Sequence, residues 1–498
     1  MEYTIQVQPG AHMDFENHAC DCIGTGRMDL ALQEEYQEEL RQVQRLCHFR
    51  HIRGHGLFSD GMAIYAPVTD ADGIRHDQYC FTYLDRVMDS YRKLGLTPVL
   101  ELGFMPSQMA SGNQTLFYWK ANVTPPAEEK RWTALIEATL EHLCERYGRK
   151  EVALWPVEVW NEPNLPGFWE NADKQAYFRL YEISVQAVRR VVPGIRVGGP
   201  AICGGAGSLE WVRDFLACCR ERKLPVDFLT RHTYMGQKPE RKGRYLYHEM
   251  CRPDDLIDEV RATRSVMEEF EEYRRLPIYI TEFNTSYNPF CPIHDTCRNA
   301  VILCSLLSKL GDVADSYSYW TFGDVFEEQG VPATLFHGGF GLMAAGCIPK
   351  PSLWAFHFFA NLEGECVHRD SRSLILHRED GSYEMILWHP DEEVQETEII
   401  RIELPWENKA TVLSRRVDET HGNPLKVWLD MGQPRNLREE ELGFLKNAAC
   451  PETVSQCMTA QDGRITLEFT LKKNSFCHIR LMKHAGLQET GYLPDMYL

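Results

Sequence analysis

Two glutamates each end a short apolar segment of the sequence. Glu162 closes the segment WPVEVWNE at residues 155–162, and Glu282 closes PIYITE at residues 277–282. Alternating apolar residues favour buried strands, and Pro163 cannot continue a ladder of hydrogen bonds. A carboxylate at the end of a buried strand is costly unless it has a partner or a function. The two segments therefore predict a pair of catalytic carboxylates.

Glycoside hydrolysis requires at least two carboxyl groups, which flank the bond that is cleaved. We expect Glu162 to be the general acid/base, with Asn161 beside it to bind a sugar 2-hydroxyl, and Glu282 to be the nucleophile. Tyr234 is expected to donate a hydrogen bond to Glu282. A separation of about 5 Å would give retention of anomeric configuration. The alternative for each glutamate is a pairing with a nearby arginine or a helix cap.

The elements that must position these residues alternate between strand and helix. Eight strands are predicted, at residues 20–26, 51–55, 97–104, 157–162, 195–200, 226–234, 278–284 and 316–322. Helical periodicity follows most of them, at residues 30–47, 81–94, 128–147, 172–192, 208–222, 254–274 and 295–310. This alternation of eight strands with helices predicts a (β/α)₈ TIM barrel, and the active site of such a barrel lies at the C-terminal ends of its strands. An open doubly wound sheet would need a glycine-rich phosphate turn, and Arg27 breaks the only fragment of one, Gly24-Thr25-Gly26.

The pattern changes to all-β near residue 365. Segments at 374–377, 383–388, 397–404, 410–416, 465–471 and 476–481 alternate apolar and polar residues, and Asp380-Gly381 is a hairpin turn signal. We expect a C-terminal β-sandwich that includes an N-terminal strand at residues 3–7. The predicted division is residues 14–345 for the catalytic barrel and residues 1–13 plus 346–498 for the β domain. Residues 436–455 are expected to form a helical or irregular excursion.

Composition limits the partners. Of the 498 residues, 53 are Lys or Arg and 72 are Asp or Glu, so the net charge is −19. This charge argues against nucleic acid and anionic membrane as partners, but not against a neutral sugar. The 17 cysteines show no paired zinc motif and are expected to be buried, reduced thiols. The sequence shows no secretory signal and no long apolar run, so we expect a cytoplasmic protein. We also expect neither a cofactor nor a metal.

The ordered set of motifs resembles the glycoside hydrolase family 39 β-xylosidases, over nearly the whole chain. The motifs are IRGHGLFSD at 52–60, ELGFMPS at 101–107, YWKANVTPP at 118–126, VWNEPN at 159–164, RHTY at 231–234, ITEFN at 280–284, YWTFGDVFEE at 319–328 and FHGGFGL at 336–342. The resemblance implies a retaining, exo-acting hydrolase of non-reducing terminal sugars. It also implies a barrel carrying a β-sandwich that borrows the N-terminal strand, and a homo-oligomer.

Further residues are expected around the substrate. His55 and His232 are candidate partners of sugar hydroxyls, with a core histidine as the alternative, and Trp320 is a candidate stacking surface for the sugar, with packing as the alternative. Glu327 and Glu328 resemble family residues that bind distal sugar hydroxyls. Phe117 and Tyr118 are expected to shape the pocket wall.

Gly54 and Gly323 depart from the family pattern close to the expected pocket, so the sequence leaves the identity of the sugar undecided. A β-xylosidase acting on xylo-oligosaccharides is the first interpretation, and an α-L-arabinosidase or α-L-iduronidase with the same machinery is the second. Iduronate would need a cation, and no Lys or Arg lies between Trp320 and Lys350. A non-catalytic sugar-binding protein would more naturally have lost one glutamate, and a metal-dependent hydrolase would need more ligands than His55 and His232.

Overall fold

Eight parallel strands close into a barrel in the computed structural model, which describes residues 2–391 and 395–486. In order around the barrel they are β2 (Cys22–Arg27), β3 (His51–His55), β6 (Thr97–Leu102), β9 (Val157–Val159), β10 (Val197–Ile202), β11 (Phe228–Tyr234), β14 (Ile278–Asn284) and β15 (Ser316–Tyr319). Strand β15 pairs with β2 and closes the sheet. The predicted barrel is confirmed, and a closed sheet rules out the doubly wound alternative.

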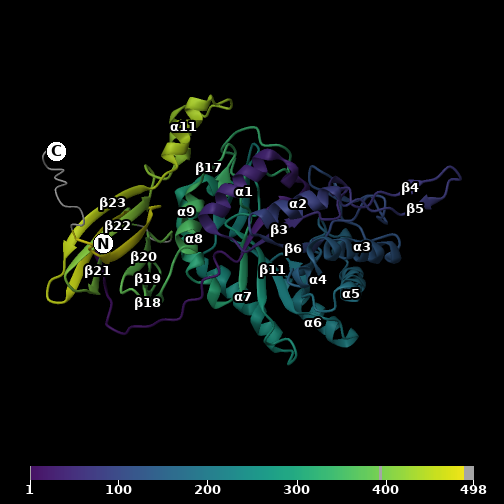
Figure 1. The fold of residues 1–498 in the computed structure, drawn as a ribbon, viewed down its shortest axis with the longest axis horizontal. Helices are drawn as coiled ribbons and strands as arrows, with labels where there is room; N and C mark the ends of the chain where they lie inside the picture. Colours follow the sequence, from purple (N-terminus) through teal and green to yellow (C-terminus); the bar gives the residue numbers. More distant parts are fainter. Residues whose placement is uncertain (1, 392–394, 487–498) are drawn as a thin grey trace.

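Eight long helices surround this barrel (Figure 1). They are α1 (Glu34–Cys47), α2 (Thr82–Lys93), α3 (Glu129–Tyr147), α5 (Lys174–Val191), α6 (Ser208–Arg222), α7 (Pro253–Glu268), α8 (Cys297–Leu307) and α9 (Pro351–Ala360). Helix α9 follows β15 and packs against α1 and α8. The sequence did not predict α9, because its segment PSLWAFHFFA is apolar on nearly every face and lacks a polar stripe. The expected division at residue 345 stays a prediction, and α9 lies beyond it on the barrel.

Shorter elements lie in the connections. The strands are β4 (Val68–Thr69), β5 (Arg75–His76), β7 (Thr115–Leu116), β8 (Ala121–Asn122), β12 (Gly236–Lys242), β13 (Tyr245–Met250), β16 (Met343–Ala344) and β17 (Ile348–Pro349). A short α-helix, α4 (Arg149–Val152), and five 3₁₀ helices complete them: residues Met28–Leu32, Asp60–Met62, Glu170–Ala172, Pro292–Asp295 and Leu310–Asp312. Most of these lie in the loops that surround the barrel strands.

Helix α5 illustrates how the sequence sets up the barrel. Asp173 caps its N-terminus by accepting hydrogen bonds from the backbone N–H groups of Gln175 and Ala176. Tyr177, in its first turn, is fully buried and donates a hydrogen bond of 3.0 Å to the carbonyl of Val159. Val159 is the last residue of β9, so the helix fixes the strand end from which Glu162 follows.

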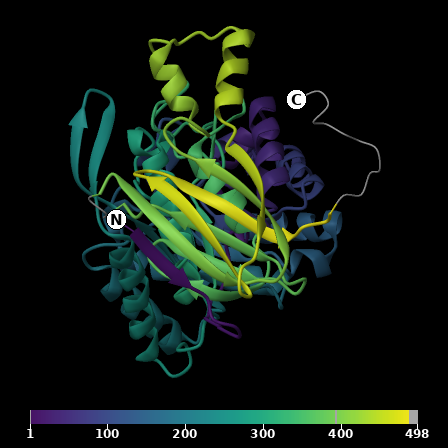
Figure 2. The ribbon, with the colours of Figure 1, turned by 90° about the vertical axis from the view of Figure 1, so that its left-hand side faces the viewer.

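Two further sheets lie beside the barrel. Six strands form one sheet, in the order β18 (Glu365–Arg369), β19 (Ser373–His377), β20 (Tyr383–Trp388), β25 (Phe476–Lys483), β22 (Lys409–Val417) and β23 (Glu452–Thr459). Three form the other: β1 (Glu2–Gln6), β21 (Thr397–Pro405) and β24 (Arg464–Lys472). Residues of both sheets, among them Ile5, Met385 and Ile400, share one hydrophobic cluster. Strand β1 pairs in parallel with β21, so the N-terminal strand lies among the C-terminal ones (Figure 2).

Helices α10 (Pro424–Asp430) and α11 (Glu439–Ala448) project between β22 and β23 (Figure 2). The excursion predicted at 436–455 is helical at α11, whereas residues 452–455 belong to β23. All 17 cysteines are free, and within the described residues none forms a disulfide. Nine of them are buried and five are partly buried, whereas Cys80, Cys450 and Cys457 are exposed, so the expectation of buried thiols was wrong for these three and holds only in part for the five. No helix in residues 2–391 or 395–486 is both long and apolar enough to cross a bilayer.

Candidate active site

Glu162 and Glu282 converge at the C-terminal end of the barrel. Both are buried, with 6% and 4% of their surface exposed. One carboxylate oxygen of each, together with a ring nitrogen of His232, lies within 4.8 Å of the others. This is the spacing at which two carboxylates can act on opposite sides of one anomeric carbon.

The backbone at Glu162 is not a strand. Strand β9 ends at Val159, three residues before the predicted end, and both Trp160 (φ 70°) and Glu162 (φ 46°) have left-handed backbone angles. The Glu162 N–H donates to the carbonyl of Ala201 at 2.9 Å, which holds the turn against β10. Such backbone angles are costly for residues other than glycine and cluster at functional sites. They turn the Glu162 side chain toward the barrel mouth.

Four side chains surround the Glu282 carboxylate. Arg53 Nη1 donates to its Oε1 at 2.7 Å, and the Tyr234 hydroxyl donates to its Oε2 at 2.6 Å. His55 Nε2 lies 3.5 Å from Oε1, and His232 Nδ1 lies 3.4 Å from Oε2. The expected contact between Tyr234 and Glu282 is therefore present. The hydrogen bonds from Arg53 and Tyr234 fix the orientation of this carboxylate, as a nucleophile requires.

Sequence reasoning missed Arg53, although it lies within one of the family motifs. Arg53 is fully buried, and besides Glu282 its guanidinium contacts Glu158 Oε2 (2.6 Å), Asn161 Oδ1 (2.8 Å) and Glu101 Oε2 (2.9 Å). Burial alone would lower the pKa of Arg53, but the surrounding carboxylates raise it. The signal in the sequence was a set of charged residues, Arg53, Glu101 and Glu158, inside strands that are otherwise apolar.

Glu162 has the properties of a proton donor. Its pKa is raised well above the ordinary value, first by burial and then by the nearby charge of Glu282. His232 Nδ1 lies 2.8 Å from Glu162 Oε1, and burial lowers the pKa of His232 well below its ordinary value. A neutral His232 supplies no positive charge that would ionise Glu162. The two carboxylates therefore differ in environment as an acid and a nucleophile must.

Glu162, His232 and Glu282 are also the one group of three side chains close enough to bind a metal ion in the part of the chain that the structure describes. Glu282 already accepts hydrogen bonds from Arg53 and Tyr234, and the Arg53 cation would repel a metal ion. The group fits a metal poorly, and the absence of a metal stays a prediction.

The sequence profile of the family described as "Glycosyl hydrolases family 39" matches residues 4–466 of this chain. The chain belongs to this family. A β-xylosidase of Geobacillus stearothermophilus is 45% identical over 484 residues, which cover 96% of this chain and 95% of the relative. A β-xylosidase of Caldicellulosiruptor saccharolyticus is 34% identical over 440 residues, covering 86% of this chain and 87% of the relative.

Solved structures agree with the family assignment. The crystal structure of a monomeric β-xylosidase from Caulobacter crescentus CB15 superposes with a TM-score of 0.87 at 30% identity, covering 97% of this chain and 100% of the other. The resemblance seen in the motifs is confirmed, and the chain is a glycoside hydrolase. Because that relative is described as monomeric, the expected homo-oligomer stays a prediction.

The pocket of this family 39 hydrolase has a volume of about 300 Å³. Five predicted residues besides the two catalytic candidates line it: His55, Asn161, Tyr234, Trp320 and Glu328. Sequence reasoning missed five others, Leu165, Phe168, Cys203, Tyr287 and Phe340. These five lie in loops after the strands, where no periodicity marks a residue as facing the pocket.

The remaining predicted residues lie behind or beside the pocket. His232 contacts Glu162, and the Phe117 ring stacks on the His55 ring with centroids 6.1 Å apart. Glu327 is paired with Arg27 and is not among the lining residues, whereas Glu328 is. Burial and the nearby charge of Glu282 raise the pKa of Glu328 well above its ordinary value.

Tyr118, Gly54 and Gly323 were expected close to the pocket, but they are not among the residues that line it. Tyr118 is 63% exposed, and its backbone N–H donates to the carbonyl of Glu328 at 2.7 Å. A Cβ on Gly54 would lie 2.6 Å from Thr25 Cγ2, and a Cβ on Gly323 would lie 2.4 Å from Glu39 Oε2. Close packing against Thr25 and Glu39 therefore explains the glycines at these two positions, and contact with the sugar does not.

Proposed function

We propose that this family 39 hydrolase is a retaining exo-β-xylosidase that removes non-reducing terminal β-D-xylosyl residues from xylo-oligosaccharides. The observation that carries the proposal is the convergence of Glu162 and Glu282, whose nearest oxygens lie within 4.8 Å of each other. Retaining enzymes place their two carboxyl groups about 5 Å apart, whereas inverting enzymes leave room for a water molecule between them.

In the first step, protonated Glu162 gives its proton to the glycosidic oxygen while a Glu282 oxygen attacks the anomeric carbon. The bond to the leaving group breaks and a covalent glycosyl-enzyme forms. In the second step, ionised Glu162 takes a proton from water, the water oxygen attacks the same carbon, and the Glu282 carboxylate leaves. The raised pKa of Glu162 and the hydrogen bonds from Arg53 and Tyr234 to Glu282 support these two roles.

Asn161 supports binding of the sugar 2-hydroxyl. Its Oδ1 accepts a hydrogen bond from Arg53, whereas its buried Nδ2 has no partner in the described part of the chain. A buried donor without a partner is costly, and a sugar hydroxyl in the pocket would satisfy it. Trp320, which also lines the pocket, offers a ring face to the apolar side of the sugar.

The lining of the pocket favours a neutral sugar over iduronate. Among the described residues that line it, none is a Lys or Arg that could meet a carboxylate. Lys350 is fully buried, and its Nζ lies 2.7 Å from Asp295 Oδ1 and 2.6 Å from Asp324 Oδ2. The two full-length relatives described above are β-xylosidases, which makes xylose the first sugar to test.

The test is turnover of a panel of nitrophenyl glycosides by wild type, Glu282→Ala and Glu162→Ala. We expect the wild type to cleave the β-D-xyloside and the Glu282 variant to lose activity. Azide should restore turnover of an activated substrate in the Glu162 variant and yield the β-xylosyl azide. Glu34→Ala, an exposed position on α1, is the control. Equal turnover by all four proteins, or an α-linked azide product, would refute the assignment.

We further propose that β1 and the C-terminal strands form an accessory β-sandwich to the catalytic barrel. The support is the hydrophobic cluster that the six-stranded and three-stranded sheets share.

A further inference from the structure

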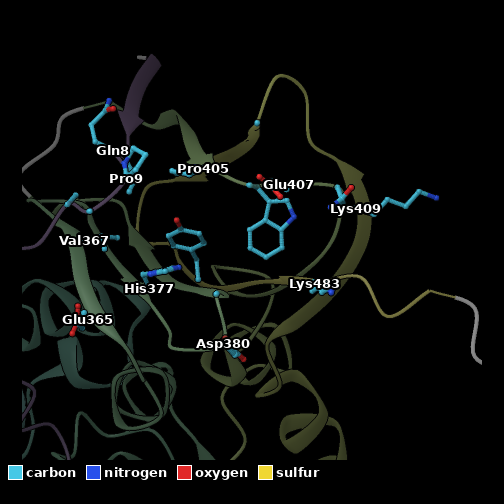
Figure 3. Close-up of a pocket in the computed structure, with 18 of the residues that line it drawn as sticks. Gln8, Pro9, Glu365, Val367, His377, Asp380, Pro405, Glu407, Lys409 and Lys483 are labelled. Atoms are coloured by element: carbon cyan, nitrogen blue, oxygen red, sulfur yellow. The ribbon is translucent and has the colours of Figure 1, made fainter.

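A cavity of about 1070 Å³ opens at one end of the two C-terminal sheets, apart from the catalytic pocket. Its walls come from the segments that follow β1 and β25, from the turn between β19 and β20, and from the turn between β21 and β22. Figure 3 shows the side chains of His377, Glu407 and Lys483 around this space. The cavity and the catalytic pocket have no lining residue in common.

We propose that this cavity is a second, non-catalytic binding site for a neutral oligosaccharide. The identity of the ligand as a xylo-oligosaccharide rests on the proposed function. Sugar recognition requires an aromatic surface for the C–H faces of the ring and polar groups for its hydroxyls. The cavity offers both.

Trp406, which is half-buried, supplies the aromatic surface, and Tyr383, with 6% of its surface exposed, packs behind it. Their ring centroids lie 6.3 Å apart with an interplanar angle of 52°, and the His377 ring lies 4.7 Å from that of Tyr383. Trp406 directly follows β21, where its backbone N–H donates to the carbonyl of Gly463 at 3.0 Å. The three rings therefore stand on ordered backbone at the junction of the two sheets.

Trp406 also carries a donor that lacks a partner. Its indole Nε1 is buried, and no acceptor reaches it within residues 2–391 and 395–486. Indole N–H groups usually find a hydrogen-bond partner when they are buried, and leaving a donor unpaired costs free energy. Because Nε1 itself is not accessible in this structure, a sugar hydroxyl in the cavity would accept this hydrogen bond only after the indole ring turns.

The charges around the cavity nearly cancel. Three acidic residues and two lysines are among the residues that line it: Glu365, Asp380, Glu407, Lys409 and Lys483. Neither an anionic nor a cationic ligand would meet a complementary field here. A hydroxyl-rich neutral ligand can instead accept hydrogen bonds from the lysines and donate to the carboxylates.

Size separates the two sites. The cavity has more than three times the volume of the catalytic pocket, about 1070 Å³ against about 300 Å³. A pocket for one terminal sugar and a larger cavity for several sugar units fit an enzyme that shortens chains from one end. Binding at the second site would keep an oligosaccharide on the enzyme between cleavages.

The experiment counts binding sites on an enzyme that cannot cleave. Calorimetric titration of Glu282→Gln with xylotetraose is expected to show two sites per chain, and Glu282→Gln/Trp406→Ala is expected to show one, with binding at the cavity weakened at least about tenfold. Trp406→Phe, which keeps a ring and removes the N–H, should weaken it less. Phe444→Ala, an exposed aromatic on α11 outside the cavity, should leave both sites.

The single variant Trp406→Ala should hydrolyse a nitrophenyl β-xyloside as the wild type does, which also shows that it folds. Hydrolysis by wild type with only one site on Glu282→Gln, or with both sites retained after Trp406→Ala, overturns the cavity proposal alone. Two sites without hydrolysis by wild type reject the proposed function alone. A changed association state of Trp406→Ala in light scattering, with both sugar sites kept, would make the cavity an interface between copies and would also overturn the proposal.

Discussion

Arg53 Nη1 lies 2.7 Å from Glu282 Oε1, and the same guanidinium reaches Asn161 Oδ1 at 2.8 Å. The buried guanidinium of Arg53 therefore orients the side chain of the proposed nucleophile and that of Asn161, which precedes the proposed acid/base. Glu282 lies on β14 and Glu162 follows β9, and Arg53 on β3 is hydrogen-bonded to Glu282 and to Asn161 beside Glu162. We expect the distance between the proposed nucleophile and the proposed acid to depend on this connection through Arg53.

Arg53→Lys should keep the positive charge but lose the planar set of N–H donors. A lysine has one nitrogen and cannot meet Glu282, Glu158 and Asn161 in the planar arrangement of a guanidinium. We expect kcat/KM for a nitrophenyl β-xyloside to fall by about 10²-fold, because small misplacements of a reacting group have costs of this size. Arg27→Lys, beside the pocket and paired with Glu327, is the matched control and should lose far less. Similar losses in both variants would contradict the positioning role.

Tyr234→Phe should slow the second chemical step more than the first. Tyr234 donates to Glu282 Oε2 at 2.6 Å, and in the proposed mechanism this hydrogen bond would stabilise the carboxylate as it leaves the glycosyl-enzyme. A hydrogen bond to a charged group is worth about 1.5–3 kcal/mol, which corresponds to roughly 10- to 100-fold in kcat. The covalent intermediate should accumulate, so kcat and KM fall together and stopped-flow traces show a burst of nitrophenolate.

Tyr287→Phe is the control for this experiment, since Tyr287 lines the same pocket and no contact with Glu282 is seen for it. It should show no burst. A rise in KM without a burst in Tyr234→Phe would indicate that Tyr234 binds the sugar and does not act through Glu282.

The sequence predicted the barrel and its two key carboxylates because both leave local signals. Strand periodicity predicted both limits of β3 and β14 and the final residue of β11, and it placed His55 and Tyr234 at strand ends. The three residues 160–162 fell outside β9 because left-handed backbone angles at Trp160 and Glu162 depend on contacts with β10 and leave no mark in the pattern. Helix α9 was missed for a related reason, since burial on all sides removes the polar face that periodicity detects.

Glu39→Gln should make the enzyme relatively more stable as pH rises. Glu39 on α1 is fully buried, and burial followed by the charge of Asp324 raises its pKa well above the ordinary value of 4.5. The folded chain therefore keeps a proton that the unfolded chain releases above that value. Its contribution to stability is full below about pH 4.5 and is lost as pH rises to the folded-state pKa, by up to about 1.4 kcal/mol per pH unit.

The glutamine has no proton to lose, so the difference in unfolding midpoint between Glu39→Gln and wild type should grow from about pH 5 to about pH 8 in scanning calorimetry. Glu34→Gln, exposed on the same helix, should give a difference that hardly changes with pH. A constant difference for Glu39→Gln would show that Glu39 is ionised in the folded protein.

Gly323→Ser should destabilise the protein through Glu39. A Cβ at position 323 would lie 2.4 Å from Glu39 Oε2, and both residues are buried. Overpacking of this kind costs about 1–3 kcal/mol. Glu39→Ala removes the obstructing carboxylate, so the double variant Gly323→Ser/Glu39→Ala should be more stable than the sum of the single effects, with a coupling of about 0.5–3 kcal/mol.

Gly443→Ser on α11 is the control, because a Cβ there would meet no atom within 4 Å. Thermal unfolding of the two single variants, the double variant and the control measures the coupling. Strict additivity would mean that positions 39 and 323 do not compete for the same space. In that case the carboxylate of Glu39 would not explain why a glycine precedes Asp324, and a serine at 323 would have to be excluded by the strand-eight loop itself.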